Sequence, residues 1–175
     1  MTFIEFPGWQ PGMEMTEERM NSAALIGRTV FKATRDTSQS IPDTASANPD
    51  VANSLSWETV EIDDLGGWAS GAPTRYTSQL DGWYKIDAKV SFNGSAAGTA
   101  RTLGIFESGT LAPGGHYRSA KTPTALVDTV TGFLSLLLAA GDYIQLAPGQ
   151  STGSALLTAT GGTRPIIEIT FARPA

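Results

Sequence analysis

The chain has 175 residues, with 12 basic and 17 acidic side chains, a net charge of −5 and a pI near 4.8. This acidic balance argues against nucleic-acid binding, which requires a basic surface. The absence of cysteine excludes disulfides, thiol nucleophiles and Cys-ligated zinc. The hydrophobic share of 41% is too high for a disordered chain, and 19 glycines and 10 prolines indicate a folded domain rich in turns.

Residues 1–27 differ from the rest of the chain, because almost all their charges are acidic and they hold all four methionines. Thr16 can cap a short helix, with Glu17 and Glu18 in its first turn and Gly27 as its end. A helix of about ten residues is marginally stable alone, so it needs a surface to lie against. That surface is either its own domain or a larger assembly. Docking on an assembly would use Phe3, Phe6, Trp9, Met13 and Met20.

Neither a targeting signal nor a membrane span is expected. The first 20 residues hold four acidic side chains and no apolar run of signal-peptide length. The longest apolar stretch, residues 133–140, is broken by Ser135 and is far shorter than the ~20 residues that a membrane helix requires.

From Thr29 onward the hydrophobic period is two, which predicts β-strands. The clearest strand is 83–92, where apolar residues alternate with polar ones before an Asn93-Gly94 turn. Residues 143–146 and 167–171 alternate in the same way. In 55–62 the alternation slips between Trp57 and Val60, which predicts a β-bulge. Residues 38–54 are expected to form a long surface loop, and residues 93–99 a second loop rich in Gly and Ser.

The segment 133–138 is apolar on both faces of a strand. Leu134, Leu136 and Leu138 lie on one face, and Phe133 and Leu137 lie on the other. An antiparallel sheet normally has one wet face, so this strand must be covered by a second layer or by another subunit. Together with the short strands and frequent turns, it predicts a β-sandwich that oligomerises.

No residue pattern points to catalysis, and neither a metal nor a cofactor is expected. His116 lies in a glycine-rich stretch, expected to be a loop, and no Cys, Asp or Glu lies within five residues of it. Four carboxylates, at Glu58, Glu61, Asp63 and Asp64, precede a glycine turn and could bind a hard cation such as calcium. They lack EF-hand spacing, so a solvated strand end is the favoured interpretation. Among the aromatic residues, Trp68 lies in a predicted loop without an evident core partner and is the candidate for ligand contact.

Three stretches resemble the globular head shared by complement component one q and the tumour necrosis factor superfamily. They are residues 76–86, residues 132–146 with their Gly141-Asp142 turn, and the closing strand, residues 164–173. The resemblance covers residues 28–175 and implies an all-β antiparallel jelly-roll sandwich that assembles as a trimer. It also implies that the three leucines of 134–138 point into the sandwich. The residues implied to face the threefold axis are Phe133, Ser135, Leu137, Ile166 and Thr170.

The N-terminal segment resembles a different group of proteins. Phe6-Pro7-Gly8-Trp9-Gln10-Pro11-Gly12-Met13, followed by Thr16-Glu17-Glu18-Arg19-Met20-Asn21, is similar to the starts of bacteriophage minor tail and fibre proteins. In those proteins a turn precedes a Thr-capped helix. The similarity implies that residues 1–27 form an extended segment and a short helix that attach to a virion.

The sequence therefore supports the hypothesis of a non-enzymatic bacteriophage virion protein, a homotrimer anchored by residues 1–27 to the tail tip, baseplate or fibre. It would assemble in the host cytoplasm, bind other virion proteins and contact a host-surface glycan or protein through its distal loops. Two alternatives are a capsid decoration or head-fibre protein, and, from another class, a free carbohydrate-binding module. A small glycoside-cleaving enzyme is disfavoured for want of a motif.

Overall fold

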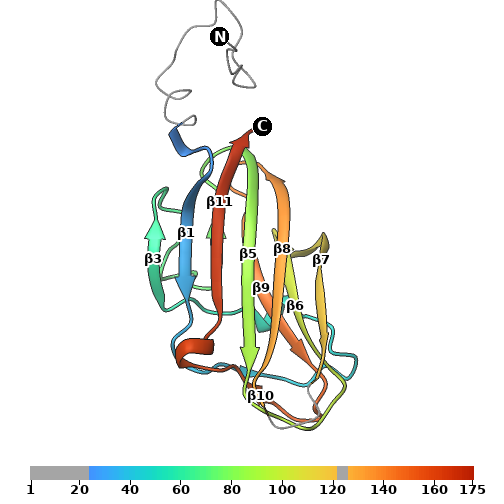
Figure 1. The fold of residues 1–175 in the computed structure, drawn as a ribbon. Coiled ribbons are helices and arrows are strands. Elements are labelled where there is room, and N and C mark those ends of the chain that lie inside the picture. Colours follow the sequence, from blue (N-terminus) through green and yellow to red (C-terminus); the bar gives the residue numbers. More distant parts are fainter. Residues whose placement is uncertain (1–23, 122–125) are drawn as a thin grey trace, which may run out of the picture.

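The computed structural model describes residues 24–121 and 126–175. Two antiparallel sheets lie face to face (Figure 1). The first has the order β3-β1-β11-β5-β8 and the second the order β4-β9-β6-β7. The strands of the first sheet are β1 (Arg28–Thr34), β3 (Thr59–Asp63), β5 (Gly82–Phe92), β8 (Asp128–Leu138) and β11 (Ile166–Pro174). Those of the second are β4 (Arg75–Thr77), β6 (Ala100–Glu107), β7 (Thr110–Ala120) and β9 (Tyr143–Gln150).

Short elements complete the described part of the chain. They are a two-stranded ladder of β2 (Ser40–Ile41) and β10 (Leu156–Leu157), and two single 3-10 turns, η1 (Val51–Asn53) and η2 (Gly161–Thr163). The all-β antiparallel sandwich predicted from the sequence is confirmed. Among the residues that the structure describes, no helix has the length and apolar character needed to cross a membrane.

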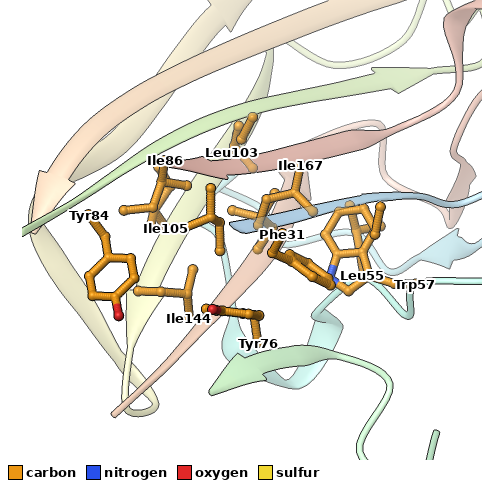
Figure 2. Close-up of a cluster of buried hydrophobic side chains, with 14 of the residues drawn as sticks. Phe31, Leu55, Trp57, Tyr76, Tyr84, Ile86, Leu103, Ile105, Ile144 and Ile167 are labelled. Atoms are coloured by element: carbon orange, nitrogen blue, oxygen red, sulfur yellow. The ribbon is translucent and has the colours of Figure 1, made fainter. Parts of the chain in front are cut away.

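The core lies between the two sheets and follows from the period-two alternation of their strands (Figure 2). On β5, Tyr84, Ile86, Ala88 and Val90 are buried, whereas Lys85 and Asp87 are exposed. Aromatic pairs add contacts with defined geometry. The rings of Phe31 and Tyr76 stack at 4.8 Å, and those of Tyr84 and Phe171 meet edge to face at 5.2 Å.

A buried arginine holds the loops at the end of the sandwich where β5 ends and β8 begins. Arg101 is 0% exposed and its Nε lies 3.4 Å from a carboxylate oxygen of Asp128. Its terminal nitrogens donate hydrogen bonds to the carbonyls of Ser95, Ala97 and Ala100, at 3.2, 3.3 and 3.0 Å. Burial lowers the pKa of this guanidinium, and the nearby carboxylate raises it in part. One side chain thus ties the loop 93–99 to the start of β8.

The strand predicted over residues 55–62 is wrong in its extent. Leu55 and Trp57 are buried but precede β3, in extended chain that bonds outside the first sheet. The Leu55 amide donates to the carbonyl of Leu146 at 2.8 Å, and the Trp57 amide donates to that of Pro73 at 2.9 Å. These residues are apolar because they enter the core between the sheets.

The predicted bulge is also displaced. The register between β1 and β3 shifts opposite the step from Val60 to Ile62, inside β3, and not between Trp57 and Val60. The loop expected at 38–54 does not lie wholly at the surface, because it contains β2 and η1 and buries Ile41 and Ala47.

The expected N-terminal helix lies for the most part in residues 1–23, outside the described residues. Its expected end, Gly27, has a φ of +77°, a left-handed conformation that glycine adopts without steric cost. β1 begins at the next residue.

Candidate assembly surface

The outer face of the first sheet carries exposed apolar side chains on its edge strand, β8. Phe133 is 57% exposed and Leu137 is 51% exposed, with the exposed Ser135 between them. On the opposite face of β8, Leu136 and Leu138 are buried at 8% and 1% exposure. Among the residues that the structure describes, β8 therefore has one face in the core and an apolar outer face without a covering layer.

The other two residues predicted to face an axis, Ile166 and Thr170, lie on β11 and are half-buried. They occupy the outer face, because Ile167 and Ile169 between and beside them are buried in the core. β11 does not adjoin β8, however, since β5 lies between the two strands. The five residues are thus on one face but form two separate groups.

Residues of β5 fill the space between these groups, and the sequence interpretation did not include them in the surface. Lys85 lies opposite Ser135 on β8 and Thr170 on β11. Asp87 lies opposite Phe133 on one side and Glu168 on the other. The polar residues that alternate in 83–92 were a sequence signal for this part of the surface. Placing them between β8 and β11 required the strand order, which the sequence does not give.

A shallow hollow of about 490 Å³ lies on this face, beside Phe133. Its lining includes Asp87, Lys89, Tyr117, Thr131, Phe133 and Glu168. Tyr117 comes from β7 and its hydroxyl donates a hydrogen bond to the carbonyl oxygen of Phe133. Gly132 makes room for that ring, since a Cβ there would lie 2.7 Å from a Tyr117 ring carbon. The hollow therefore depends on the contact between the edge strands of the two sheets.

The carboxylates considered as a strand-end cluster go to separate partners. Glu61 pairs with Lys32 at 2.6 Å, which raises the pKa of the lysine, chiefly through the side-chain hydrogen bond. Asp64 pairs with Arg28 at 3.2 Å. Asp63 accepts hydrogen bonds from two backbone amides, those of residues 67 and 68, at 2.8 and 3.2 Å. Within 24–121 and 126–175, no group of three or more potential metal-ligating side chains is found.

The fourth carboxylate, Glu58, belongs to a network with Asp36 that holds the turn after β1. Burial alone would raise the pKa of Glu58, but hydrogen bonds from Thr37 and the charge of Arg35 lower it below its ordinary value. The pKa of Asp36 is lowered chiefly by the hydrogen bond from the Thr59 hydroxyl. Arg164 adds an ion pair to Asp36 at 3.0 Å. Both carboxylates are thus held in their charged forms by the fold.

Trp68 is half-buried and packs against the core cluster. Its indole nitrogen donates to the carbonyl of Pro73 at 3.3 Å, and its backbone bridges to Tyr76. The interpretation that it has no core partner is therefore wrong, while its role in ligand contact stays a prediction.

His116 is exposed on β7 and not in the loop that the sequence predicted. The residues predicted for virion attachment, Phe3, Phe6, Trp9, Met13 and Met20, lie outside the described residues.

Comparison with solved structures agrees with this architecture. The globular domain of zebrafish complement 1qA has a TM-score of 0.54 and 12% identity, covering 83% of this chain and 97% of that domain. Eiger TNF from S. frugiperda has a TM-score of 0.56 and 10% identity, with 84% and 94% coverage. Murine APRIL has a TM-score of 0.57 and 10% identity, with 82% and 98% coverage. The fold is the C1q and TNF jelly roll. No family model and no curated protein matches the chain, so the similarity of this jelly roll to known proteins is one of fold alone.

Proposed function

We propose that the chain is a non-enzymatic structural protein of a bacteriophage particle, in which three copies assemble through the outer face of the β3-β1-β11-β5-β8 sheet. The observation that carries the assembly is the exposure of Phe133 and Leu137 on the outer face of β8. The phage setting is supported by the resemblance of residues 6–21 to tail and fibre proteins. Residues 1–27 would attach the trimer to the tail tip, baseplate or fibre.

The apolar pair gives the proposed assembly a driving force. The exposed fractions of Phe133 and Leu137, 57% and 51%, correspond to roughly 100 Å² for each residue. Removing that area from water at about 25 cal/mol per Å² contributes about 2.5 kcal/mol for each residue. Three copies repeat the contact, so the interface gains several kilocalories per mole before its polar contacts are considered.

The oligomeric state tests this first. Light scattering after size exclusion should give three times the subunit mass of 18.4 kDa. Phe133→Asp should release folded monomers, because the charge is tolerated on an exposed face but not in an interface. Leu136→Asp is the matched control on the same strand, and it should unfold the subunit because it places a charge in the core. A wild-type protein that is a stable monomer would overturn the proposal.

Attachment to a particle needs a separate test. Deleting residues 1–27 should leave a folded trimer, because β1 begins at Arg28, but abolish incorporation into particles. Insolubility of the truncated protein would show that the segment belongs to the core of its own domain. Immunogold labelling of intact particles would distinguish a tail position from capsid decoration, and failure to label any particle would contradict a virion role.

A further inference from the structure

The centre of the proposed interface is charged. Along β5, Lys85, Asp87 and Lys89 share the outer face at alternate positions, about 6.8 Å apart. On β11, Glu168 lies directly opposite Asp87 in the ladder. Two carboxylates in such a cross-strand position repel each other, which is unfavourable within one sheet. The arrangement leaves a local excess of negative charge between two lysines.

Within the described residues, these four side chains form no ion pair with one another. In the described ranges of the chain, Lys85, Asp87 and Lys89 form no ion pair, and Glu168 accepts only a hydrogen bond from Thr29, at 2.7 Å. Lys32 on β1 lies directly opposite Glu168 and interacts with its charge, but the ion pair of this lysine is with Glu61, at 2.6 Å. The surface therefore holds two lysines and two carboxylates whose charges sum to zero.

This neutrality contrasts with the rest of the protein. The chain carries a net charge of −5, so the whole excess of negative charge lies outside these four residues. Copies of an acidic protein repel one another across most of their surfaces. A surface with equal numbers of both charges is one that can meet another copy of itself without net repulsion.

We propose that Lys85, Asp87, Lys89 and Glu168, here called the charged patch, form ion pairs between copies of this chain, with the lysines of one copy against the carboxylates of the next. The inference rests on the proposed trimer and deepens it by naming its polar contacts. Charge complementarity favours a second copy as the occupant, since a small anion or cation would match only half of the patch. The patch is also continuous with the exposed Phe133, which lies directly opposite Asp87.

Ion pairs between copies determine the orientation in which two surfaces associate, as well as contributing to their affinity. Opposite charges across an interface orient the partners, while like charges placed together suppress wrong pairings. The apolar side chains on β8 supply attraction without direction. The charged patch would therefore select the register in which the copies associate.

Two single-sign variants and one swapped variant test the inference. Asp87→Lys with Glu168→Lys makes the patch wholly positive, and Lys85→Glu with Lys89→Glu makes it wholly negative. Each should raise the dissociation midpoint concentration of the trimer at least tenfold. The variant with all four reversals regains complementarity and should return to within about threefold of wild type. Arg118→Glu, on the exposed face of β7, is the control and should leave the midpoint unchanged.

The outcomes separate the two proposals. A monomeric wild type overturns the trimer and the inference together. A trimeric wild type whose single-sign variants remain trimers overturns the inference alone, and so does a swapped variant that fails to reassemble. Circular dichroism of each variant shows whether loss of assembly is loss of folding. If the variants unfold, the wild-type protein provides the test. Raising the salt concentration from about 0.05 to 0.5 M should raise the dissociation midpoint concentration of the trimer at least tenfold. An unchanged midpoint would refute ion pairing through the charged patch.

Discussion

Replacing Arg101 by methionine should lower the free energy of unfolding by about 3–5 kcal/mol, the range for breaking a buried ion pair. The side chain is 0% exposed, so methionine keeps most of its apolar contacts while removing the charge. Asp128, at 3.4 Å, then loses its cationic neighbour, and three carbonyls of the 95–100 segment lose their donors. Each lost hydrogen bond alone is worth about 1 kcal/mol, so the loss of three bonds amounts to about 3 kcal/mol. This agrees with the range for breaking a buried ion pair.

Urea unfolding followed by tryptophan fluorescence, at one fixed protein concentration, measures this change. Arg118→Met is the matched control, because that arginine is exposed on β7 and its loss should change stability by less than about 0.5 kcal/mol. Combining Arg101→Met with Asp128→Asn should cost less than the two changes separately, since contacting residues are not additive. A loss below 1 kcal/mol for Arg101→Met would refute the reasoning that the guanidinium holds these loops.

Three other measurements check separate parts of the molecule. The fold lowers the pKa values of Asp36 and Glu58, so the stabilisation from these carboxylates is present above their ordinary pKa values of 3.8 and 4.5. That stabilisation is lost as the pH falls through the lower pKa values of the folded state. The urea midpoint should therefore drop in that acidic range, and it should drop less steeply in Glu58→Gln. Gly132→Ala should cost about 1–3 kcal/mol in thermal unfolding by overpacking the ring from β7, whereas Gly71→Ala, with open space around its Cβ, should have little effect. Trp68→Ala should lower the unfolding temperature, because the indole packs on the core; lost glycan binding at unchanged stability would instead support the ligand role.

The alternation of apolar and polar residues in the sequence predicted well which face of a strand is buried, because the two-residue period of a strand is fixed by backbone geometry. Residues 83–90 and the segment around Leu136 show the expected burial, whereas Ser91, on the polar face of its strand, is buried. The first residues of 55–62 were wrongly assigned to a strand, because alternation is a property of any extended chain. An extended chain outside a sheet alternates like a strand, so Leu55 and Trp57 satisfy the pattern without belonging to β3.

The candidate surface was predicted only in part, since alternation does not give the order of strands in a sheet. Phe133 and Ile166 were assigned to one face, but which strand separates them depends on hydrogen bonds between residues far apart in the chain. Trp68 was misjudged because its core contacts come from other segments, among them Tyr76 across an isolated bridge. Local composition carries no signal for such contacts.

The hydrogen bond from Tyr117 to the carbonyl of Phe133 also bears on aggregation. Within residues 24–121 and 126–175, β8 is paired only with β5, so its other side is a sheet edge. An unpaired edge is a template for strand addition by another chain. A side chain from the neighbouring sheet is hydrogen-bonded to the backbone of this edge strand, in the middle of its apolar segment. In the proposed trimer, the subunits would meet through the outer face of β8 while access to its backbone is restricted, which favours a closed assembly over an open fibril.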